Sequence, residues 1–324
     1  MTDYKDIHGF QIEIRSSNPT NLVNGQVWYN TTNSKLRGAT VSSVGAWSTG
    51  GTMNSARYAL AGAGTQTSAL GFGGTLDPPV SALVESYNGS AWTEVGDLNQ
   101  QRYVLAGAGA SNTAALAFGG FIPPRSAETE TWNGTAWTEV ADLNTARNSL
   151  AGDGTNTAAI AFGGASSTGK TEKWNGTSWA ETADLNTARY SLAGGGTYTS
   201  ALAFGGFASP RTAVTESWND TSWTEVADLN AARDNLMGTG SDNDNALCIG
   251  GYTNTEVNLD STELWNGTSW SEQNNLSIGV RTSGATGTTA AAISFAGVNP
   301  SAGKVAVSEE WNVPFIGIRE FDLS

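Results

Sequence analysis

The chain has almost none of the residues on which enzymes most often depend. Its 324 residues include one histidine, His8, and one cysteine, Cys248. A single cysteine excludes an intrachain disulfide framework. One histidine near the start excludes a Ser-His-Asp triad or a histidine metal cluster within the long remainder of the chain. Cys248 lies in the apolar run 246–250, where a small buried hydrophobic residue is the simplest interpretation.

Basic residues are also scarce. Charged side chains make up 14% of the chain, and 16 Lys and Arg against 30 Asp and Glu give a formal net charge of −14. Nucleic acid and anionic membrane surfaces attract basic proteins, so we expect neither as a partner. No apolar run approaches the ~18 residues of a membrane span. The opening residues 1–15 lack the apolar block of a signal peptide, and none is expected.

Glycine, by contrast, is abundant and belongs to a repeat. Six times an arginine follows a tryptophan, and a run of small residues then ends in Gly-Gly or, in the last copy, Ala-Gly. The arginines are separated by 45, 45, 42, 44 and 48 residues. A period in the forties without a helical pattern predicts a β-propeller or another repeat array, in which the shared residues are scaffold. The repeated arginines are Arg57, Arg102, Arg147, Arg189, Arg233 and Arg281.

Each repeat, of which residues 185–228 are one example, contains an aromatic hairpin. In another copy, Asn133 and Gly134 form the Asn-Gly dipeptide that favours a type I′ turn. A two-residue turn there places Trp132 and Trp137 diagonally across one face of the hairpin. We expect such an aromatic pair to pack against the neighbouring repeat.

Two more strands precede each hairpin, at 190–193 and 201–206 in the example repeat. Small side chains suit strands crowded near a central axis, and the aromatic hairpin suits the wider rim. The arginine, the Gly-Gly and the aromatic pair together resemble the kelch repeat over residues 44–313. The resemblance implies an all-β, six-bladed, kelch-like β-propeller with four antiparallel strands in each blade.

Two unpaired tryptophans predict how the ring closes. Trp47 lies ten residues before Arg57, the usual spacing of tryptophan and arginine, but no hairpin strand precedes it. Trp311 has the opposite defect, because residues 313–314 are Val-Pro where other repeats turn into a second strand. We expect the strand of Trp47 to complete the last blade beside Trp311, which removes an open sheet edge.

Residues 1–43 and 314–324 fall outside the repeats and form an N-terminal extension and a C-terminal tail. They contain alternating runs at 10–15 and 315–321 and a hairpin-like run at 26–37, all typical of strands. We expect the strands at the two ends to pair with each other or with another subunit.

The segments 4–9 and 24–32, together with the near-identical repeats, resemble the kelch-type structural proteins of marine tailed bacteriophages. This resemblance implies a virion protein without catalytic activity or cofactor, such as an appendage, tail-fibre or decoration protein. It also implies that residues 1–43 and 314–324 contact other virion proteins or a further copy of the chain. Host recognition is then the expected task of the propeller.

Recognition is expected where the repeats differ most, in the segments after each Gly-Gly. Loops on a rigid scaffold commonly carry recognition, and aromatic rings beside polar groups suit a host surface glycan or a protein. Ordinary loops stiffened by proline explain the same residues equally well. The candidate ligand-binding residues are Phe121, Pro124, Arg125, Phe207, Arg211 and Tyr252.

The sequence also allows other functions. A glycan-processing enzyme would need an asymmetric acid pair, whereas Glu130 and Glu139 recur in the other complete hairpins. An intracellular or secreted kelch scaffold for protein partners is a further alternative. The unique cluster 241–245 offers oxygen ligands for Ca²⁺ but lacks the glycine and distal glutamate of a calcium loop, so a solvated turn and no metal are expected. The repeated arginines are expected to pair with Asp97, Asp142, Asp184 and Asp228.

Overall fold

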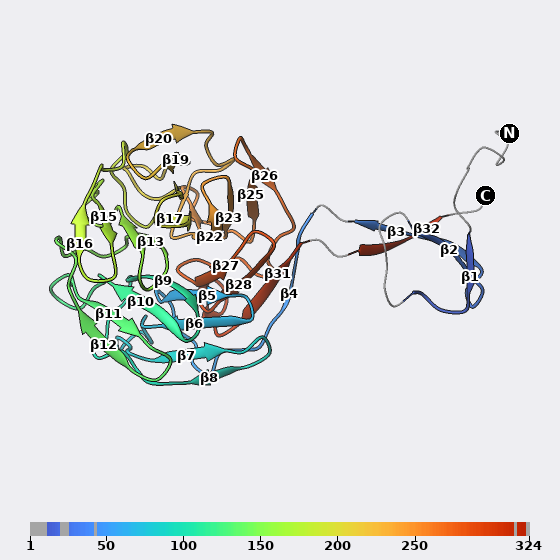
Figure 1. Cartoon of the computed structure of the whole chain (residues 1–324), viewed down its shortest axis with the longest axis horizontal. Coiled ribbons are helices and arrows are strands. Elements are labelled where there is room, and N and C mark those ends of the chain that lie inside the picture. Colours follow the sequence, from blue (N-terminus) through green and yellow to red (C-terminus); the bar gives the residue numbers. More distant parts are fainter. Residues whose placement is uncertain (1–11, 20–25, 42–43, 314–315, 322–324) are drawn as a thin grey trace. The chain divides into compact units, whose positions relative to one another are not determined.

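The computed structural model describes residues 12–19, 26–41, 44–313 and 316–321. Within these ranges every regular element is a β-strand and no helix occurs. The chain divides into two compact units, one of Met1–Gly45 with Asn312–Ser324 and one of Ala46–Trp311. The all-β architecture, with many four-stranded antiparallel sheets, is that of a propeller-like protein (Figure 1).

The described part of the larger unit contains six four-stranded sheets, here called sheets I to VI. Sheet I consists, from first to fourth strand, of β5 (Ala61–Thr65), β6 (Ser68–Phe72), β7 (Val84–Tyr87) and β8 (Trp92–Glu94). Sheet II consists in the same order of β9 (Ala106–Ser111), β10 (Ala114–Phe118), β11 (Thr129–Trp132) and β12 (Trp137–Val140). Sheet III consists of β13 (Ala151–Gly154), β14 (Ala159–Phe162), β15 (Thr171–Trp174) and β16 (Trp179–Glu181). Sheet IV consists of β17 (Ala193–Gly196), β18 (Ala201–Phe204), β19 (Thr215–Trp218) and β20 (Trp223–Val226). Sheet V consists of β22 (Met237–Asp242), β23 (Asn245–Ile249), β25 (Thr262–Trp265) and β26 (Trp270–Glu272). Sheet VI consists of β27 (Gly284–Gly287), β28 (Ala291–Phe295), β31 (Ser308–Asn312) and β4 (Ala46–Thr49).

The first strand of each sheet lies near the centre of this unit and the fourth strand near its edge (Figure 1). Each first strand contacts the first strands of two other sheets, and β27 contacts β5. Their alanine and glycine residues make this close approach possible. A Cβ added to Gly238, for example, would lie 2.2 Å from the Gly194 carbonyl oxygen of the adjoining sheet.

Hydrogen bonds outside the sheets also join successive sheets. In each case a residue just before the first strand donates its N–H to the carbonyl of the equivalent residue in the preceding sheet, over 2.7–2.9 Å. The first of the six then donates to the last. The donor and acceptor pairs are Val104 to Ala59, Ser149 to Val104, Ser191 to Ser149, Asn235 to Ser191, Thr282 to Asn235, and Ala59 to Thr282.

The aromatic hairpins differ from the expected two-residue turn. Trp132 pairs directly with Trp137 across the strands, and Asn133 donates its N–H to the Ala136 carbonyl, so the loop has four residues. The Asn133 side chain accepts hydrogen bonds from the N–H groups of Thr135 and Ala136. This Asx turn supplies the reversal that a type I′ turn was expected to supply. The prediction of a diagonal aromatic pair was therefore wrong.

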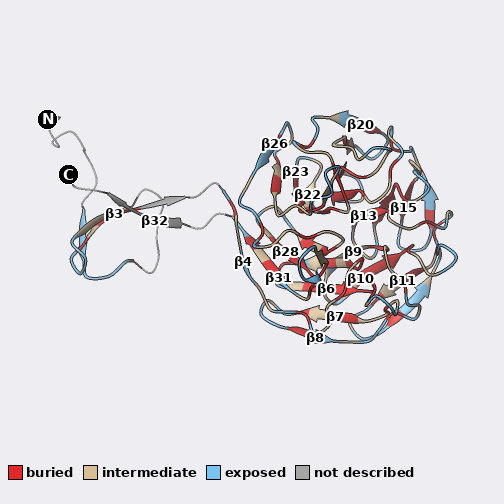
Figure 2. Ribbon diagram, turned by 180° about the vertical axis from the view of Figure 1, so that it is seen from behind, coloured by how far each residue is buried: buried red, intermediate tan, exposed pale blue. Residues whose placement is uncertain are grey.

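Aromatic packing holds neighbouring sheets together. A phenylalanine of the second strand packs against the outer tryptophan of the next sheet, as with Phe72 and Trp137, whose ring centroids are 5.3 Å apart. Phe295 of sheet VI packs against Trp92 of sheet I in the same way, at 4.9 Å. Figure 2 shows buried residues along the strands and exposed residues on outer strands such as β20.

The strand that carries Trp47 belongs to sheet VI, although it precedes the other three strands by more than 230 residues. Trp47 and Trp311 lie 5.4 Å apart, close to the 5.5 Å of Trp132 and Trp137. The two tryptophans without a hairpin partner are thus the two halves of one pair, as the sequence predicts. β4 supplies the fourth strand that sheet VI lacks locally.

Five of the repeated arginines are buried, but their partners are not the expected aspartates. Each pairs with a buried glutamate of the third strand. Asp97 and the equivalent aspartates instead accept a backbone N–H, in this case from Val84. The ion pairs are Arg57–Glu85 (2.5 Å), Arg102–Glu130 (3.1 Å), Arg147–Glu172 (3.0 Å), Arg189–Glu216 (2.6 Å) and Arg233–Glu263.

Arg281 does not belong to this set. The Val280 carbonyl accepts the Gly251 N–H, as the carbonyl of Arg233 accepts the Gly206 N–H, so Val280 occupies the arginine position of sheet VI. Val280 is buried and Arg281 is half-buried. The prediction that Arg281 is a scaffold arginine was wrong by one residue in register.

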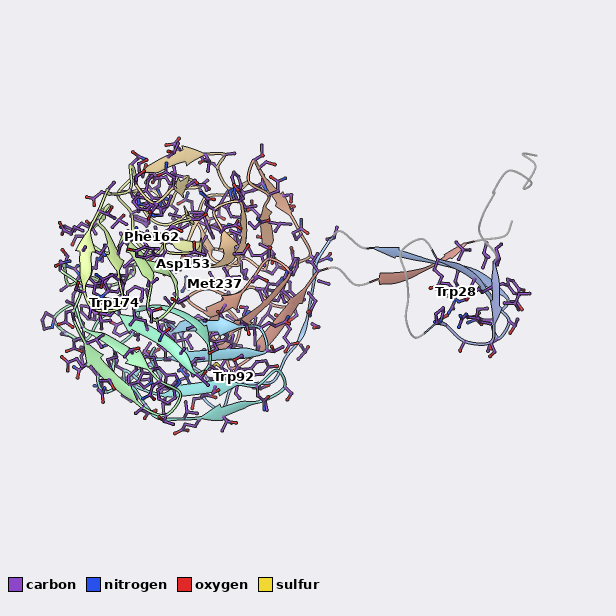
Figure 3. The ribbon with its side chains drawn as sticks, viewed as in Figure 1. Trp28, Trp92, Asp153, Phe162, Trp174 and Met237 are labelled. Atoms are coloured by element: carbon purple, nitrogen blue, oxygen red, sulfur yellow. The ribbon has the colours of Figure 1, made fainter. Side chains whose placement is uncertain are left out.

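The smaller unit is a four-stranded sheet in the order β1 (Glu13–Arg15), β2 (Val27–Asn30), β3 (Lys35–Val41) and β32 (Ile316–Phe321). β1 runs parallel to β2, and the expected hairpin of β2 and β3 is present. β3 pairs with β32, so the strands of the two chain ends pair with each other. Trp28 is buried within this unit (Figure 3). His8, Phe10 and residues 4–9 lie outside the described residues.

Candidate functional site on the loop face

The loops after the Gly-Gly positions gather at one end of the six sheets, here called the loop face. In five sheets the residue after Gly-Gly forms a β-bridge with the residue that follows the arginine position. In sheet III the Ala165 N–H donates to the Asn148 carbonyl at the same place. The bridged pairs are Tyr58 with Thr75, Tyr103 with Phe121, Tyr190 with Phe207, Asp234 with Tyr252, and Arg281 with Val298.

Phe121, Pro124 and Arg125 form one group of candidates in sheet II. The Phe121 ring meets Tyr103 edge-on at 5.6 Å. Arg125 reaches the next sheet, where its Nε donates to the Asn148 side chain over 3.2 Å. Pro124 follows a cis peptide bond and is exposed, as is Arg125. These residues present a rigid ring and a cation on the loop face.

Phe207, Arg211 and Tyr252 form a second group across sheets IV and V. The Arg211 guanidinium lies 4.7 Å from the centre of the Tyr252 ring and 5.8 Å from that of Phe207. Its Nε donates to the carboxylate of Asp234 over 2.7 Å. Arg281 lies on Tyr252 as well, at 4.1 Å. Tyr252 therefore contacts two guanidinium groups, of which Asp234 neutralises one.

The candidate rings are less exposed than the sequence indicates. Phe121, Phe207 and Tyr252 are all half-buried, because each is bridged to a neighbouring residue and the first two stack on tyrosines. Tyr103 and Tyr190, which supply those tyrosine rings, were not identified from the sequence. Their positions directly after Arg102 and Arg189 could have identified them.

A cavity of about 700 Å³ also opens on the loop face beside sheet VI. Tyr58 and Asp77 of sheet I, Arg281 and Lys304 of sheet VI and Asn235 of sheet V contribute to its lining. Burial, followed by the charge of Asp77, raises the pKa of the Tyr58 phenol, and Arg281 acts in the opposite direction. None of these residues was a candidate, since Arg281 was assigned to the scaffold.

The repeated carboxylates and the 241–245 cluster, which the sequence raised as alternatives, have scaffold contacts. Glu130 faces Glu139 but binds Asn99 and Arg102. In the 241–245 cluster, the Asn243 amide donates to the Trp218 carbonyl, much as Asn112 donates to the Tyr87 carbonyl. The described residues hold no group of three or more His, Cys, Asp or Glu side chains that could bind a metal ion.

Cys248 and Asp153 are described residues whose pKa values are strongly raised by burial. Burial raises the pKa of the Cys248 thiol to about 12, so the thiolate needed for nucleophilic attack is disfavoured. Asp153 lies near the centre of the larger unit (Figure 3), beside a hollow of about 130 Å³ lined mostly by glycine and alanine. Burial raises the pKa of its carboxyl well above the ordinary value. Its Oδ2 has no hydrogen-bond partner within the described residues.

No protein-family model matches this chain, and no curated protein matches its sequence. In the part of the chain that the structure describes, no helix is long and apolar enough to cross a membrane.

Proposed function

We propose that this chain is a non-enzymatic binding protein, a kelch-like β-propeller that acts as a structural or appendage protein of a bacteriophage virion and recognises a host surface glycan. One observation carries the proposal. The residues shared by the repeats are engaged in buried scaffold contacts, whereas the residues that differ gather on the loop face as rings and cations. Binding then depends on Phe121, Arg125, Phe207, Arg211 and Tyr252.

The proposed scaffold is a closed ring of six blades, one for each of sheets I to VI. Three sets of contacts support it, because each continues from sheet VI to sheet I. The first is the hydrogen bond from Ala59 to Thr282. The second is the packing of Phe295 on Trp92. The third is the hydrogen bond from the Trp92 indole to Ser308. A ring of this kind has no free sheet edge and so resists strand pairing between molecules.

The virion assignment rests on the resemblance of residues 4–9 and 24–32 to phage structural proteins. We further propose that residues 1–43 and 314–324 attach the protein to other virion components or to another copy of itself. Purified virions of the phage that encodes this chain should yield its peptides by mass spectrometry. Their absence from intact particles contradicts a virion role.

Glycan recognition is tested by binding of the full chain to a glycan array. We expect binding to be lost in Phe121→Ala combined with Arg125→Ala, because a ring and a cation are removed without touching the buried scaffold. The matched control is Thr138→Ala combined with Glu139→Ala, which changes two exposed residues of β12 in the same sheet. An array without any bound glycan contradicts this part of the proposal and favours the alternative, a scaffold for protein partners.

A further inference from the structure

We propose that the cavity beside sheet VI is a binding site for an acidic sugar, held through its carboxylate by Arg281. This inference rests on the proposed role in glycan recognition and names the class of ligand. The site is formed by residues 58, 77, 235, 281 and 304, which come from three different sheets. The ligand class follows from the charge, the stacking surfaces and the size of the cavity.

The cavity lies where sheet VI lacks the bridged pair of rings found in sheets II and IV. In sheets II and IV a bridged pair of rings, such as Tyr103 and Phe121, occupies this part of the loop face. In sheet VI the equivalent residues are Arg281 and Val298. Arg281 lies against Tyr252 of sheet V, and the smaller Val298 leaves space that the second ring fills elsewhere. The result is a hollow of about 700 Å³, large enough for one or two sugar rings.

Among the residues that the structure describes, Arg281 is a cation without an acidic partner. Arg211, which also lies against the Tyr252 ring, is neutralised by Asp234. Within the described residues, no hydrogen bond or ion pair involves the guanidinium of Arg281. The contact with the Tyr252 ring, 4.1 Å from the guanidinium carbon to the ring centre, positions Arg281 and uses none of its N–H groups. These N–H groups are available to bind both oxygens of a carboxylate.

The other lining groups suit the remainder of a sugar. Tyr58 provides an aromatic surface, and Asp77 and the Asn235 amide provide acceptors and donors for hydroxyl groups. Lys304 donates a hydrogen bond to the Leu76 carbonyl and so ties the hairpin of β29 (Val298–Asn299) and β30 (Gly303–Lys304) to a loop of sheet I. The two cations of the cavity outnumber Asp77, which favours an anionic ligand even though the whole chain has a net charge of −14.

The test measures binding of D-glucuronic acid and D-glucose to the full chain by titration calorimetry and saturation-transfer NMR. The two sugars differ only at C6, which is a carboxylate in glucuronic acid and a hydroxymethyl group in glucose. We expect glucuronic acid to bind at least about tenfold more tightly, and Arg281→Ala to remove that preference. Arg281→Lys should retain part of it, because the charge remains and the paired geometry is lost. Lys170→Ala removes a cation of sheet III that pairs with Glu181 outside the cavity. It is the matched control and should leave the preference for glucuronic acid unchanged.

Failure of this inference can be told apart from failure of the proposed function. Equal affinity for the two sugars, or a preference for glucuronic acid that survives Arg281→Ala, overturns the site. If the chain binds neutral glycans on the array, and the Phe121→Ala and Arg125→Ala variant loses that binding, the proposed function holds even though the acidic-sugar site at Arg281 does not. A short Gly-Glu peptide that binds at Arg281 while glucuronic acid does not would also overturn the sugar assignment. Circular dichroism verifies that each variant is folded.

Discussion

At the scale of single residues, the buried arginine–glutamate pairs are the most sensitive part of the scaffold. Arg147 is fully buried, and its guanidinium contacts Glu172 and the carbonyls of Lys170 and Ala161. Burial lowers the pKa of this arginine, and the charge of Glu172 counteracts the effect. The attraction between the two charges therefore offsets part of the cost of removing them from water.

Replacing Arg147 by methionine should destabilise the protein by about 3–5 kcal/mol, because it leaves Glu172 buried and uncompensated. Urea denaturation followed by circular dichroism measures the loss. The double variant Arg147→Met with Glu172→Leu should lose less than the single variant, since no isolated charge remains. A loss below about 1 kcal/mol in the single variant, the size typical of an exposed pair, would show that the charges are not buried together.

Asp153 predicts a dependence of stability on pH. Its pKa is raised in the folded state by burial, so the folded protein holds a proton that the unfolded chain releases above its ordinary carboxyl pKa. Stability should therefore be highest in acid, as far as this group is concerned, and should fall as the pH rises towards the folded pKa. Asp153→Ala introduces the residue found at the equivalent positions 63 and 108. Its melting temperature should exceed the wild-type value at pH 7, with a smaller gain at pH 4. An equal gain at both pH values contradicts the assignment.

At the scale of the strands, hydrogen bonds from outer-strand tryptophans join one sheet to the preceding one. The indole of Trp179 donates to the Thr129 hydroxyl over 3.1 Å, and that of Trp223 donates to Thr171 over 3.0 Å. Trp137 is the exception, because Val84 occupies the position of the threonine. Its Nε1 is buried and has no partner among the described residues.

Val84→Thr should supply the missing acceptor and stabilise the protein by about 1 kcal/mol. A buried threonine in place of valine is ordinarily unfavourable, so the sign of this change is informative. Thermal unfolding of the wild type and the variant measures it. In the Trp137→Phe background, which has no indole N–H, the same substitution should no longer stabilise. A gain that persists there must have a different origin.

At the scale of the whole molecule, closure of the proposed ring depends on β4. Its Trp47 packs on Trp311 and donates its indole N–H to Thr262 over 2.9 Å. If β4 is an integral outer strand, Trp47→Ala should lower stability by about 2–4 kcal/mol, approaching the effect of Trp179→Ala. Chemical denaturation compares the two variants, with exposed Thr49→Ala as the control. A near-neutral Trp47→Ala would mean that β4 does not hold sheet VI together.

Much of this arrangement can be predicted from residue spacing. The tryptophan positions identify the strands, and the halves at Trp47 and Trp311 identify the swapped strand, because an aromatic pair needs both members. The register error at Arg281 was also avoidable. A spacing of ten residues separates tryptophan from arginine in five repeats, and ten residues after Trp270 lies Val280. The interval of 48 residues between Arg233 and Arg281, longer than the other intervals, indicated the error.

The partners of the arginines were less predictable. Asp97 and Glu85 are both acidic and both lie in the same repeat as Arg57, so the sequence alone does not distinguish between them as partners. Only the fold places Glu85 on a third strand that faces Arg57, while Asp97 binds a backbone N–H. The four-residue turn has a similar explanation, since the Asn133 side chain replaces the backbone geometry that Asn-Gly ordinarily provides.

The sequence by itself determined the strands, their order within each repeat and five of the six arginines assigned to the scaffold, because these depend on local patterns that recur. The tertiary structure decided which charges meet and where space remains. Arg281 is far from Tyr58 and Asp77 in the chain and shares no motif with them. They line one cavity because neighbouring sheets bring their loops to the same end, and because a valine occupies the position at which sheets II, IV and V have a ring.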